Sequence, residues 1–210
     1  MAVQPIIKTF RYSIKELIPY INWSYFYHFW QIPDSAAQKA DTDEQWSTLQ
    51  KDIDTILEEL GRHYAVRSRV GLFEANSDGD DILIYHHESP TVLPCLRQQD
   101  KKESNSPNLC LSDFIMPQKM GQRDHIGIFA CTVEHGMEEH YAAESVYHLL
   151  GQSLCIRLVE AAAEKLHEEV RKKLWGYAPD ESLSMEDLFH EKFQGIRPAI
   201  GYPSLPDHTI

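Results

Sequence analysis

A proline- and glycine-rich stretch near the end of the sequence, GIRPAIGYPSLPDHT (195–209), restricts the fold more than any other part of the chain. Its three prolines fix φ and remove three backbone donors, and its two glycines allow conformations that other residues avoid. Such a segment forms neither a regular helix nor a central strand. We therefore expect an ordered, extended loop that presents backbone carbonyls and a few side chains.

Two side chains of this loop are suited to recognition, Arg197 and Tyr202. The planar guanidinium of Arg197 matches a carboxylate, and the ring of Tyr202 offers a flat apolar face with a hydroxyl at its edge. On composition alone, the simpler interpretation is a surface connection with an incidental arginine. The local physics leaves both interpretations open.

The length of the chain and its net charge indicate how many domains to expect and which classes of partner to exclude. The chain has 210 residues and a formal net charge of -12. We expect one domain over 1–210, with a helical N-terminal part (1–62) and a sheet, long helix and loop in 63–210. An acidic chain is a poor partner for nucleic acid or an anionic membrane. Four cysteines without a CxxC pair indicate reduced thiols, and the N-terminus lacks the apolar core of a signal peptide, so we expect a cytoplasmic protein.

Helical signals dominate the N-terminal part. Ser13 and Glu16 form a capping-box pattern, and Asn22 suits the N-cap of an aromatic helix. The packed face of that helix is expected to carry Trp23, Phe26, Tyr27 and Trp30. Apolar residues at helical spacing predict another helix over 43–60, followed by Gly61 at its C′ position.

The middle of the chain has strand signals. Residues 66–74 and 81–86 are β-type runs on either side of NSDGD (76–80), which predicts a hairpin. A third strand is expected over 91–96. The apolar run 126–133, rich in β-branched and aromatic residues, predicts a buried strand.

One long helix is predicted over 138–175, with an apolar stripe at helical spacing. The stripe comprises Leu150, Leu154, Leu158, Ala162, Leu166, Val170 and Leu174. A short acidic helix should begin with Ser184 and Asp187 and end near Gly195, and the polar run 97–108 should be an exposed, mobile loop. Together these elements predict an α+β fold: a twisted, mainly antiparallel sheet with the long helix packed on it and additional helices.

The loop sequence resembles the RPAxGYP signature of the activation (reactivation) domain of cobalamin-dependent methionine synthase. Other segments resemble that family in the same order and spacing. They are VGLFEANSDGDDILIY from Val70, LRQQ from Leu96, LSDFIMP from Leu111, DHIGIFACT from Asp124, and a nearly continuous stretch from Arg157 to Thr209. The resemblance implies the α+β fold of that domain.

The resemblance also implies a ligand, S-adenosylmethionine. Arg197 would bind the ligand carboxylate. Tyr202 and the loop around Ala199 and Gly201 would face the adenosine and the positively charged sulfonium. A wall rich in carbonyl oxygens suits a cationic sulfur by the sign of the Coulomb interaction.

Two residues outside the loop complete the set that the resemblance implies. Glu160 lies among small residues of the predicted long helix; its spacing alone indicates a solvated helix charge, whereas the resemblance places it at the ligand site. Asn22 stands where the family usually has an aspartate that contacts the methionine amino group. Asparagine keeps an acceptor oxygen but loses the charge, so weaker ligand binding is expected.

No GxSxG, Walker, GxGxxG or zinc-ligand spacing occurs, so we expect neither a metal site nor catalysis by this chain alone. The resemblance implies a reactivation module. S-adenosylmethionine would supply a methyl group, and a flavodoxin-like donor an electron, to oxidised cobalamin held by a partner in methionine biosynthesis.

That partner would be methionine synthase or a corrinoid protein. Because the chain stops at Ile210, soon after the signature, we expect a stand-alone, C-terminally short version that acts in trans. One alternative is a non-catalytic interaction subunit that has lost ligand binding. Another is the activation module of a different corrinoid methyltransferase.

Overall fold

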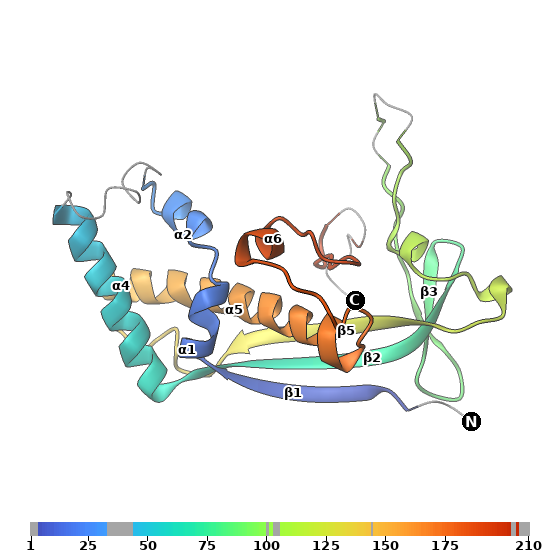
Figure 1. Cartoon of the computed structure of the whole chain (residues 1–210), viewed down its shortest axis with the longest axis horizontal. Coiled ribbons are helices and arrows are strands. Elements are labelled where there is room, and N and C mark those ends of the chain that lie inside the picture. The colour runs from blue at the N-terminus through green and yellow to red at the C-terminus, as the bar shows by residue number, and fades with distance from the viewer. Residues whose placement is uncertain are drawn as a thin grey trace. The chain divides into compact units, whose positions relative to one another are not determined.

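The computed structural model describes residues 4–32, 44–99, 101–102, 106–143, 145–202 and 205. The chain forms two compact units, each assembled from segments that are distant in sequence (Figure 1). The first unit comprises Met1–Lys8, Val70–Phe129 and Gly195–Ile210, and the second comprises Thr9–Arg69 and Ala130–Gln194. The expected single domain over 1–210 stays a prediction.

Five strands form one sheet. They are β1 (Ile6–Ser13), β2 (Ala65–Asp78), β3 (Asp81–Tyr85), β4 (Thr91–Leu93) and β5 (Asp124–Val133). The first four are neighbours in that order, and β5 pairs with β2. The pairs β2–β3 and β3–β4 are antiparallel. The antiparallel sheet and the additional helices confirm the predicted α+β fold.

The predicted hairpin is present, but its turn is shorter than expected. Asp78 pairs with Asp81, which leaves only Gly79 and Asp80 in the loop, and Gly79 has a φ of +62° that glycine adopts without strain. Asn76 and Ser77, expected in the turn, are buried in β2.

Buried carbonyl oxygens explain this longer strand. The Asn76 amide donates to the carbonyl oxygens of Met116 (3.0 Å) and Gln122 (2.8 Å), and the Ser77 hydroxyl donates to that of Ile115 (2.8 Å). Buried polar groups persist in a strand when they have such partners.

Two other strand predictions need correction. The third strand ends at Leu93 rather than at residue 96, because Pro94 has no N–H for a ladder hydrogen bond. The strand predicted over 126–133 is present in β5, but its predicted burial is wrong, because Ile126 is its one buried residue and Ile128 is 46% exposed. An apolar, β-branched run indicates β propensity without fixing burial.

The first unit has its own apolar core. Its buried members are Ala75, Ile82, Ile84, Leu93, Leu111, Ile115, Ile126 and Leu205. They come from β2 to β5, from η2 (Leu111–Phe114) and from the C-terminal loop. The short η3 (Gln118–Met120) lies on the connection to β5.

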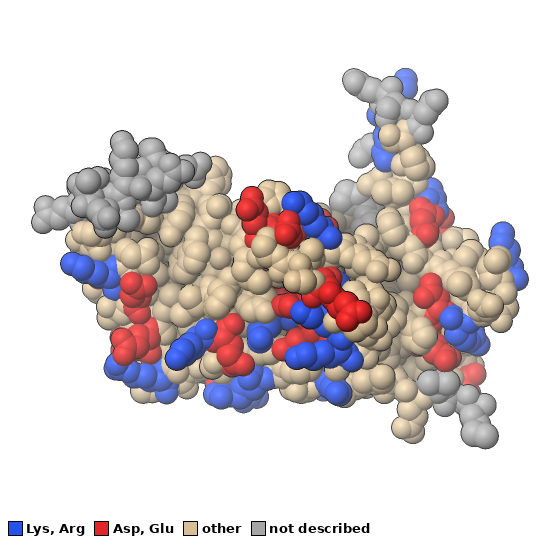
Figure 2. Space-filling model, viewed as in Figure 1, with Lys and Arg blue, Asp and Glu red and all other residues tan. Residues whose placement is uncertain are grey.

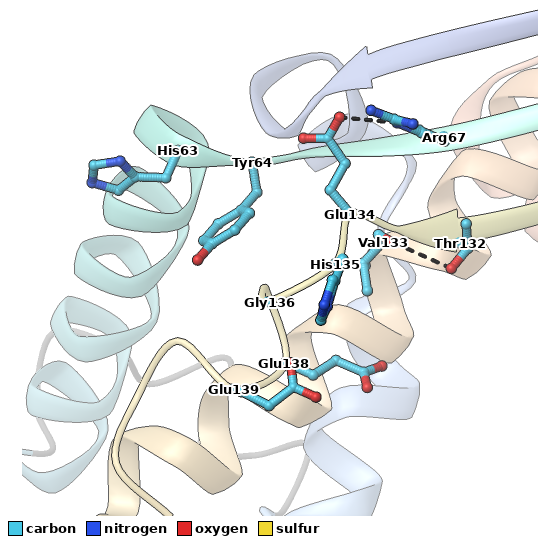
Figure 3. A pocket seen from close by; sticks show the side chains of 10 residues that line it. All are labelled: His63, Tyr64, Arg67, Thr132, Val133, Glu134, His135, Gly136, Glu138 and Glu139. Atoms are coloured by element: carbon cyan, nitrogen blue, oxygen red, sulfur yellow. Dashed lines mark hydrogen bonds and ion pairs between the residues drawn. The ribbon is translucent and has the colours of Figure 1, made fainter.

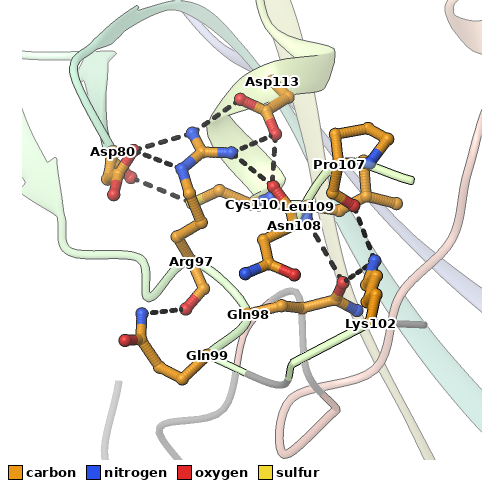
Figure 4. A network of polar contacts seen from close by, with 10 residues as sticks. All are labelled: Asp80, Arg97, Gln98, Gln99, Lys102, Pro107, Asn108, Leu109, Cys110 and Asp113. Carbon is orange, nitrogen blue, oxygen red and sulfur yellow. Dashed lines mark hydrogen bonds and ion pairs between the residues drawn. The ribbon is translucent and has the colours of Figure 1, made fainter. Parts of the chain in front are cut away.

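Arg97 organises a polar network beside this core (Figure 4). Its guanidinium donates to Asp80 (2.7 Å), to both carboxylate oxygens of Asp113 (2.6 and 2.7 Å) and to the carbonyl oxygen of Asn108 (2.8 Å). The Gln98 N–H donates to the carbonyl oxygen of Leu109 (2.9 Å). The two ends of the segment 97–108 are therefore held by hydrogen bonds, so the expected mobile loop is wrong there. Residues 100 and 103–105 lie outside the described part.

The second unit contains helices together with the ends of β1, β2 and β5. The helices are α1 (Ile14–Leu17), η1 (Ile18–Tyr20), α2 (Trp23–Phe29), α4 (Glu44–His63), α5 (Val146–Glu169), η4 (Val170–Leu174) and α6 (Met185–Phe189). The long α5 packs against α1, η1, α2 and α4. No helix of the described ranges is both long and apolar enough to cross a membrane.

The predicted N-caps are confirmed at three helix starts. Ser13 with Glu16 and Ser184 with Asp187 form complete capping boxes, and the Asn22 side chain caps α2. The helix that begins after Ser184 ends at Phe189, earlier than the predicted end near residue 195. Helix α4 extends past the predicted end at residue 60, since the Tyr64 N–H donates to the Leu60 carbonyl and Gly61 stays helical. Its predicted start at residue 43 lies outside the described residues.

The long helix is shorter than predicted. It begins at Val146, after Ser145 caps the His148 N–H (3.1 Å), instead of at residue 138. Residues 138–143 form turns instead, and the side chains of His140 and Tyr141 are held there by contacts with Glu59 of α4, at 3.1 and 2.8 Å. At the other end, Val170–Leu174 is a π-helix.

The predicted apolar faces are confirmed. Six members of the α5 stripe are buried, namely Leu150, Leu154, Leu158, Ala162, Leu166 and Val170, and Leu174 is half-buried. On α2, Phe26 is buried, and Trp23, Tyr27 and Trp30 are half-buried. The Trp30 indole N–H donates to the Ser153 hydroxyl of α5 (3.1 Å).

Leu158→Ala should lower the free energy of unfolding by about 2–5 kcal/mol, because it leaves a cavity at a fully buried position. Urea unfolding monitored by circular dichroism measures this loss. The control is Gln152→Ala, at an exposed position of the same helix, which should change stability by less than about 0.5 kcal/mol. Similar losses in both variants would show that the stripe is not the core.

Candidate functional site

Asn22 occupies the N-cap of α2 and is half-buried. Its Oδ1 accepts a hydrogen bond from the Ser24 N–H (3.2 Å). The same orientation presents the amide NH₂ as a donor. The acceptor oxygen that the sequence suggested for a ligand amino group is thus engaged in capping the helix.

Glu160 lies on the exposed side of α5, with 53% of its side chain accessible. Its Oε2 is 2.8 Å from Nη1 of Arg157, one helical turn earlier. The Arg157 guanidinium in turn lies 5.9 Å from the centre of the Tyr25 ring of α2. This carboxylate is accessible and charge-paired, which suits a solvated helix charge and equally a group that exchanges its arginine for a ligand.

The RPAxGYP loop is ordered through a tight turn. Gly201 has a φ of +94°, and its N–H donates to the Leu205 carbonyl (2.8 Å), while the Leu205 N–H donates to the Tyr202 carbonyl (2.9 Å). Leu205 is buried in the core of the first unit, whereas Tyr202 remains 63% exposed. The loop is therefore fixed by an apolar anchor, which the sequence did not predict, and its aromatic ring is exposed.

The other described residues of the loop are half-buried or exposed. Arg197 and Pro198 are half-buried, and Ala199 is exposed. The Ala199 carbonyl accepts from the Tyr202 N–H at 3.4 Å. Residues 203, 204 and 206–209 of the predicted loop lie outside the described residues.

The predicted ligand residues fall in both compact units. The second unit contains Asn22 and Glu160, and the first contains Arg197, Ala199, Gly201 and Tyr202. Each group is described within its own unit, and their joint role in binding one ligand stays a prediction.

The second unit also contains a cavity of about 700 Å³ that the sequence did not reveal (Figure 3). It is lined by His63, Tyr64, Arg67, Thr132, Val133, Glu134, His135, Gly136, Glu138 and Glu139. The run EHG (134–136) directly after an apolar strand is the only signal in the sequence that could have indicated it.

Glu134 acts as a clamp at the edge of this cavity. Its carboxylate is 2.8 Å from Arg11 Nε and 3.1 Å from Arg67 Nε, and it accepts the Ala65 N–H at 3.0 Å. The bond from Arg11, aided by those from Arg67 and the Ala65 N–H, lowers the pKa of Glu134 to about 2. The clamp thereby ties β1 and β2 to the end of β5.

A second polar cluster includes Tyr64, which lines the cavity. Glu59 of α4 accepts the Tyr141 hydroxyl (2.8 Å) and lies 3.1 Å from His140 Nε2, and His140 Nδ1 lies 3.3 Å from the Tyr64 hydroxyl. These contacts hold the turn after β5 against α4. Within the described ranges, no three His, Cys, Asp or Glu side chains are grouped closely enough to hold a metal ion.

A comparison with protein families matches residues 13–210 to the family described as vitamin B12 dependent methionine synthase, activation domain. The chain belongs to this activation-domain family. A solved structure described as the MetH reactivation domain bound to AdoHcy superposes with a TM-score of 0.87. It is 38% identical in sequence, and the match covers 99% of this chain and 68% of that chain.

This membership confirms the resemblance on which the ligand residues were assigned. It also supports the fold, because an activation domain with the same elements superposes over nearly the whole chain. The roles of the six assigned residues remain predictions.

Glu134→Gln should weaken the dependence of stability on acid pH. Because the folded-state pKa of Glu134 (about 2) lies below its unfolded value of about 4.3, its stabilising contribution is complete above about pH 5 and is lost as the pH falls towards 2. Urea unfolding at pH 6 and pH 3 should show a smaller fall for the variant than for the wild type. Arg11→Met should act in the same direction, and an unchanged fall in both variants would contradict the clamp.

Proposed function

We propose that this chain binds S-adenosylmethionine and presents its methyl group for the reductive methylation of cobalamin held by a partner protein. The observation that carries the proposal is the ordered RPAxGYP loop, in a chain 38% identical to a reactivation domain crystallised with AdoHcy. The demethylated form of the ligand occupies that related domain, so the methyl donor is the natural substrate class for this one.

The chemistry of the loop fits the ligand. The guanidinium of Arg197 binds the amino-acid carboxylate in a bidentate, charge-assisted contact. The exposed ring of Tyr202 contacts the adenosine, and the turn at Gly201, with Ala199, offers backbone groups to the sulfonium side. These atoms bind and orient the ligand, which reduces the entropy lost when the methyl group meets its acceptor.

Two residues of the second unit are assigned to the amino group and its surroundings. Glu160 is exposed and negative, so it is suited to a ligand ammonium or hydroxyl group. Asn22 is the weaker contributor, because its amide oxygen already caps α2. We therefore expect this chain to bind S-adenosylmethionine less tightly than a relative with aspartate at the same position.

The remaining parts of the reaction are assigned to partner proteins. Cobalamin, bound by methionine synthase or another corrinoid protein, accepts the methyl group, and a flavodoxin-like donor supplies the electron. We propose that this chain acts in trans, in the cytoplasm, as a non-catalytic half of that system.

The ligand site is tested by titration calorimetry with S-adenosylmethionine and with AdoHcy. Arg197→Ala should weaken binding by about tenfold to a hundredfold, since one charge-assisted partner of the carboxylate is lost. Arg197→Lys should lose nearly as much, because a point charge does not reproduce the planar fork. Wild-type affinity in both variants would exclude Arg197 from the site.

Asn22→Asp should strengthen binding, because a carboxylate can cap the helix with one oxygen and offer the other, with its charge, to the ligand ammonium. The gain should shrink as the salt concentration rises if the site is open to solvent. Absence of binding heat in both the wild type and Asn22→Asp at millimolar ligand would reject the ligand proposal. The interaction-subunit alternative, which the change to asparagine favours, would then take its place.

A further inference from the structure

The last segment of the second unit, 176–194, leads directly into the loop that carries Arg197. It contains one short helix, α6, which ends at Phe189. Five residues separate α6 from the boundary between the units, which falls after Gln194. The position of this segment decides where the loop begins.

A π-helical turn redirects the chain at the start of this segment. The Trp175 and Gly176 N–H groups both donate to the Val170 carbonyl, at 2.9 and 3.2 Å. Gly176 then adopts a φ of +75°. The chain reverses there, and the Ala178 N–H donates to the carbonyl of Arg171 (3.0 Å). π-turns within helices are frequent at functional sites.

The Arg171 side chain holds the returning segment at two further points. It is 0% exposed, and its Nε and Nη2 donate to the two carboxylate oxygens of Glu181, at 2.8 and 2.5 Å. Its guanidinium carbon lies 4.5 Å from the centre of the Phe193 ring, against which the His167 ring also packs edge-on. One side chain thus fixes both Glu181 and Phe193.

The end of the segment is fixed beside it. The Tyr177 hydroxyl donates to the carbonyl of Gln194, the last residue of the unit, at 3.1 Å. Gly195 follows with a φ of +93°. The two residues before this glycine are therefore held, one by a ring contact with Arg171 and the other by a hydrogen bond.

Stability alone is a weak reason for a buried ion pair. Removing two charges from water offsets most of their attraction, and apolar residues of similar size often serve as well or better. Among the described residues, Arg171 Nη1 is also buried without a hydrogen-bond partner, which adds to the desolvation penalty. What an apolar pair does not reproduce is the fixed, bidentate geometry.

We infer that Arg171 is a positioning residue for the ligand loop. It fixes the residues that directly precede the loop 195–202, and so reduces the motion of Arg197 and Tyr202 before the ligand binds. This role rests on the proposed function, but the ordering of the loop is a property of the free protein. Pre-organisation raises affinity because less motion is lost on binding.

The decisive variant replaces the pair with apolar side chains, Arg171→Met together with Glu181→Met, which leaves no unpaired buried charge. The matched control is Arg62→Met with Glu58→Met, an exposed ion pair of α4 in the same unit. A second variant, Phe193→Leu, removes the ring contact and keeps the ion pair. Thermal unfolding establishes that each variant is folded at the temperature of the binding experiments.

Two measurements are made on each folded protein. Hydrogen exchange followed by mass spectrometry should show faster exchange in the peptide covering 195–205 for the apolar pair and for Phe193→Leu. Calorimetry with AdoHcy should show about tenfold weaker binding for the same two variants. The control should match the wild type in both measurements.

The outcomes separate this inference from the proposed function. If the wild type does not bind AdoHcy, the proposed function fails, and the exchange of 195–205 still decides whether Arg171 orders the loop. If the wild type binds, and the folded apolar-pair variant keeps wild-type exchange and affinity, the positioning role is overturned. Faster exchange with unchanged affinity also overturns it, because ordering would then have no effect on the ligand.

Discussion

The burial of one face of α5 is the interaction on which the second unit depends. Ten of its residues, four of them leucines, lie inside, and α1, η1, α2 and α4 all pack against this helix. Each buried leucine contributes about 1.5–3 kcal/mol relative to exposure, and the contacts fix the rotation of the helix about its axis. Glu160 and Arg157 are consequently held at a defined place on its outer side. A charged group on a rigid helix needs little ordering when it meets a ligand.

The RPAxGYP loop is anchored by residues that precede it and by a residue that follows its turn. Before it, the segment that ends at Gln194 is attached to η4 and α5 through Arg171 and Tyr177. After the turn at Gly201, Leu205 is buried among residues of β2, β3 and β5. Between these anchors the loop can present an exposed ring without being disordered. Prolines make this arrangement favourable, since they reduce the conformational freedom of the unfolded chain.

The features that sequence reasoning predicted are those that depend on neighbours within a few residues. The leucine spacing predicted the buried face of α5, and Ser13, Asn22 and Ser184 predicted three helix starts. The features that it missed depend on distant partners. The delayed start of α5 accompanies contacts of His140 and Tyr141 with Glu59, a residue about eighty positions earlier, and the exposure of Ile128 depends on what covers β5. The cavity beside Glu134 likewise arises where the end of one strand meets the start of another.

The candidate site likewise has features that the sequence predicted and features that it did not. Proline and glycine content predicted an ordered loop, but local physics favoured an incidental arginine, and only the family resemblance assigned Arg197 and Glu160 to a ligand. The buried pair of Arg171 and Glu181 was not predicted, because charged residues ten positions apart are neighbours only when the chain reverses between them. That reversal needs the π-turn, which no simple periodicity encodes.

Asn22 shows why a residue has to be judged in its structure as well as by its chemical type. As a sequence feature it differs from aspartate by one charge and keeps an oxygen. In the structure that oxygen caps the first turn of α2, and the amide nitrogen is a donor that a ligand ammonium group cannot use. A carboxylate would satisfy the cap with one oxygen and retain a second acceptor and a negative charge. The helix start is therefore equally well formed with either residue, whereas only the carboxylate would offer a negative charge to an amine.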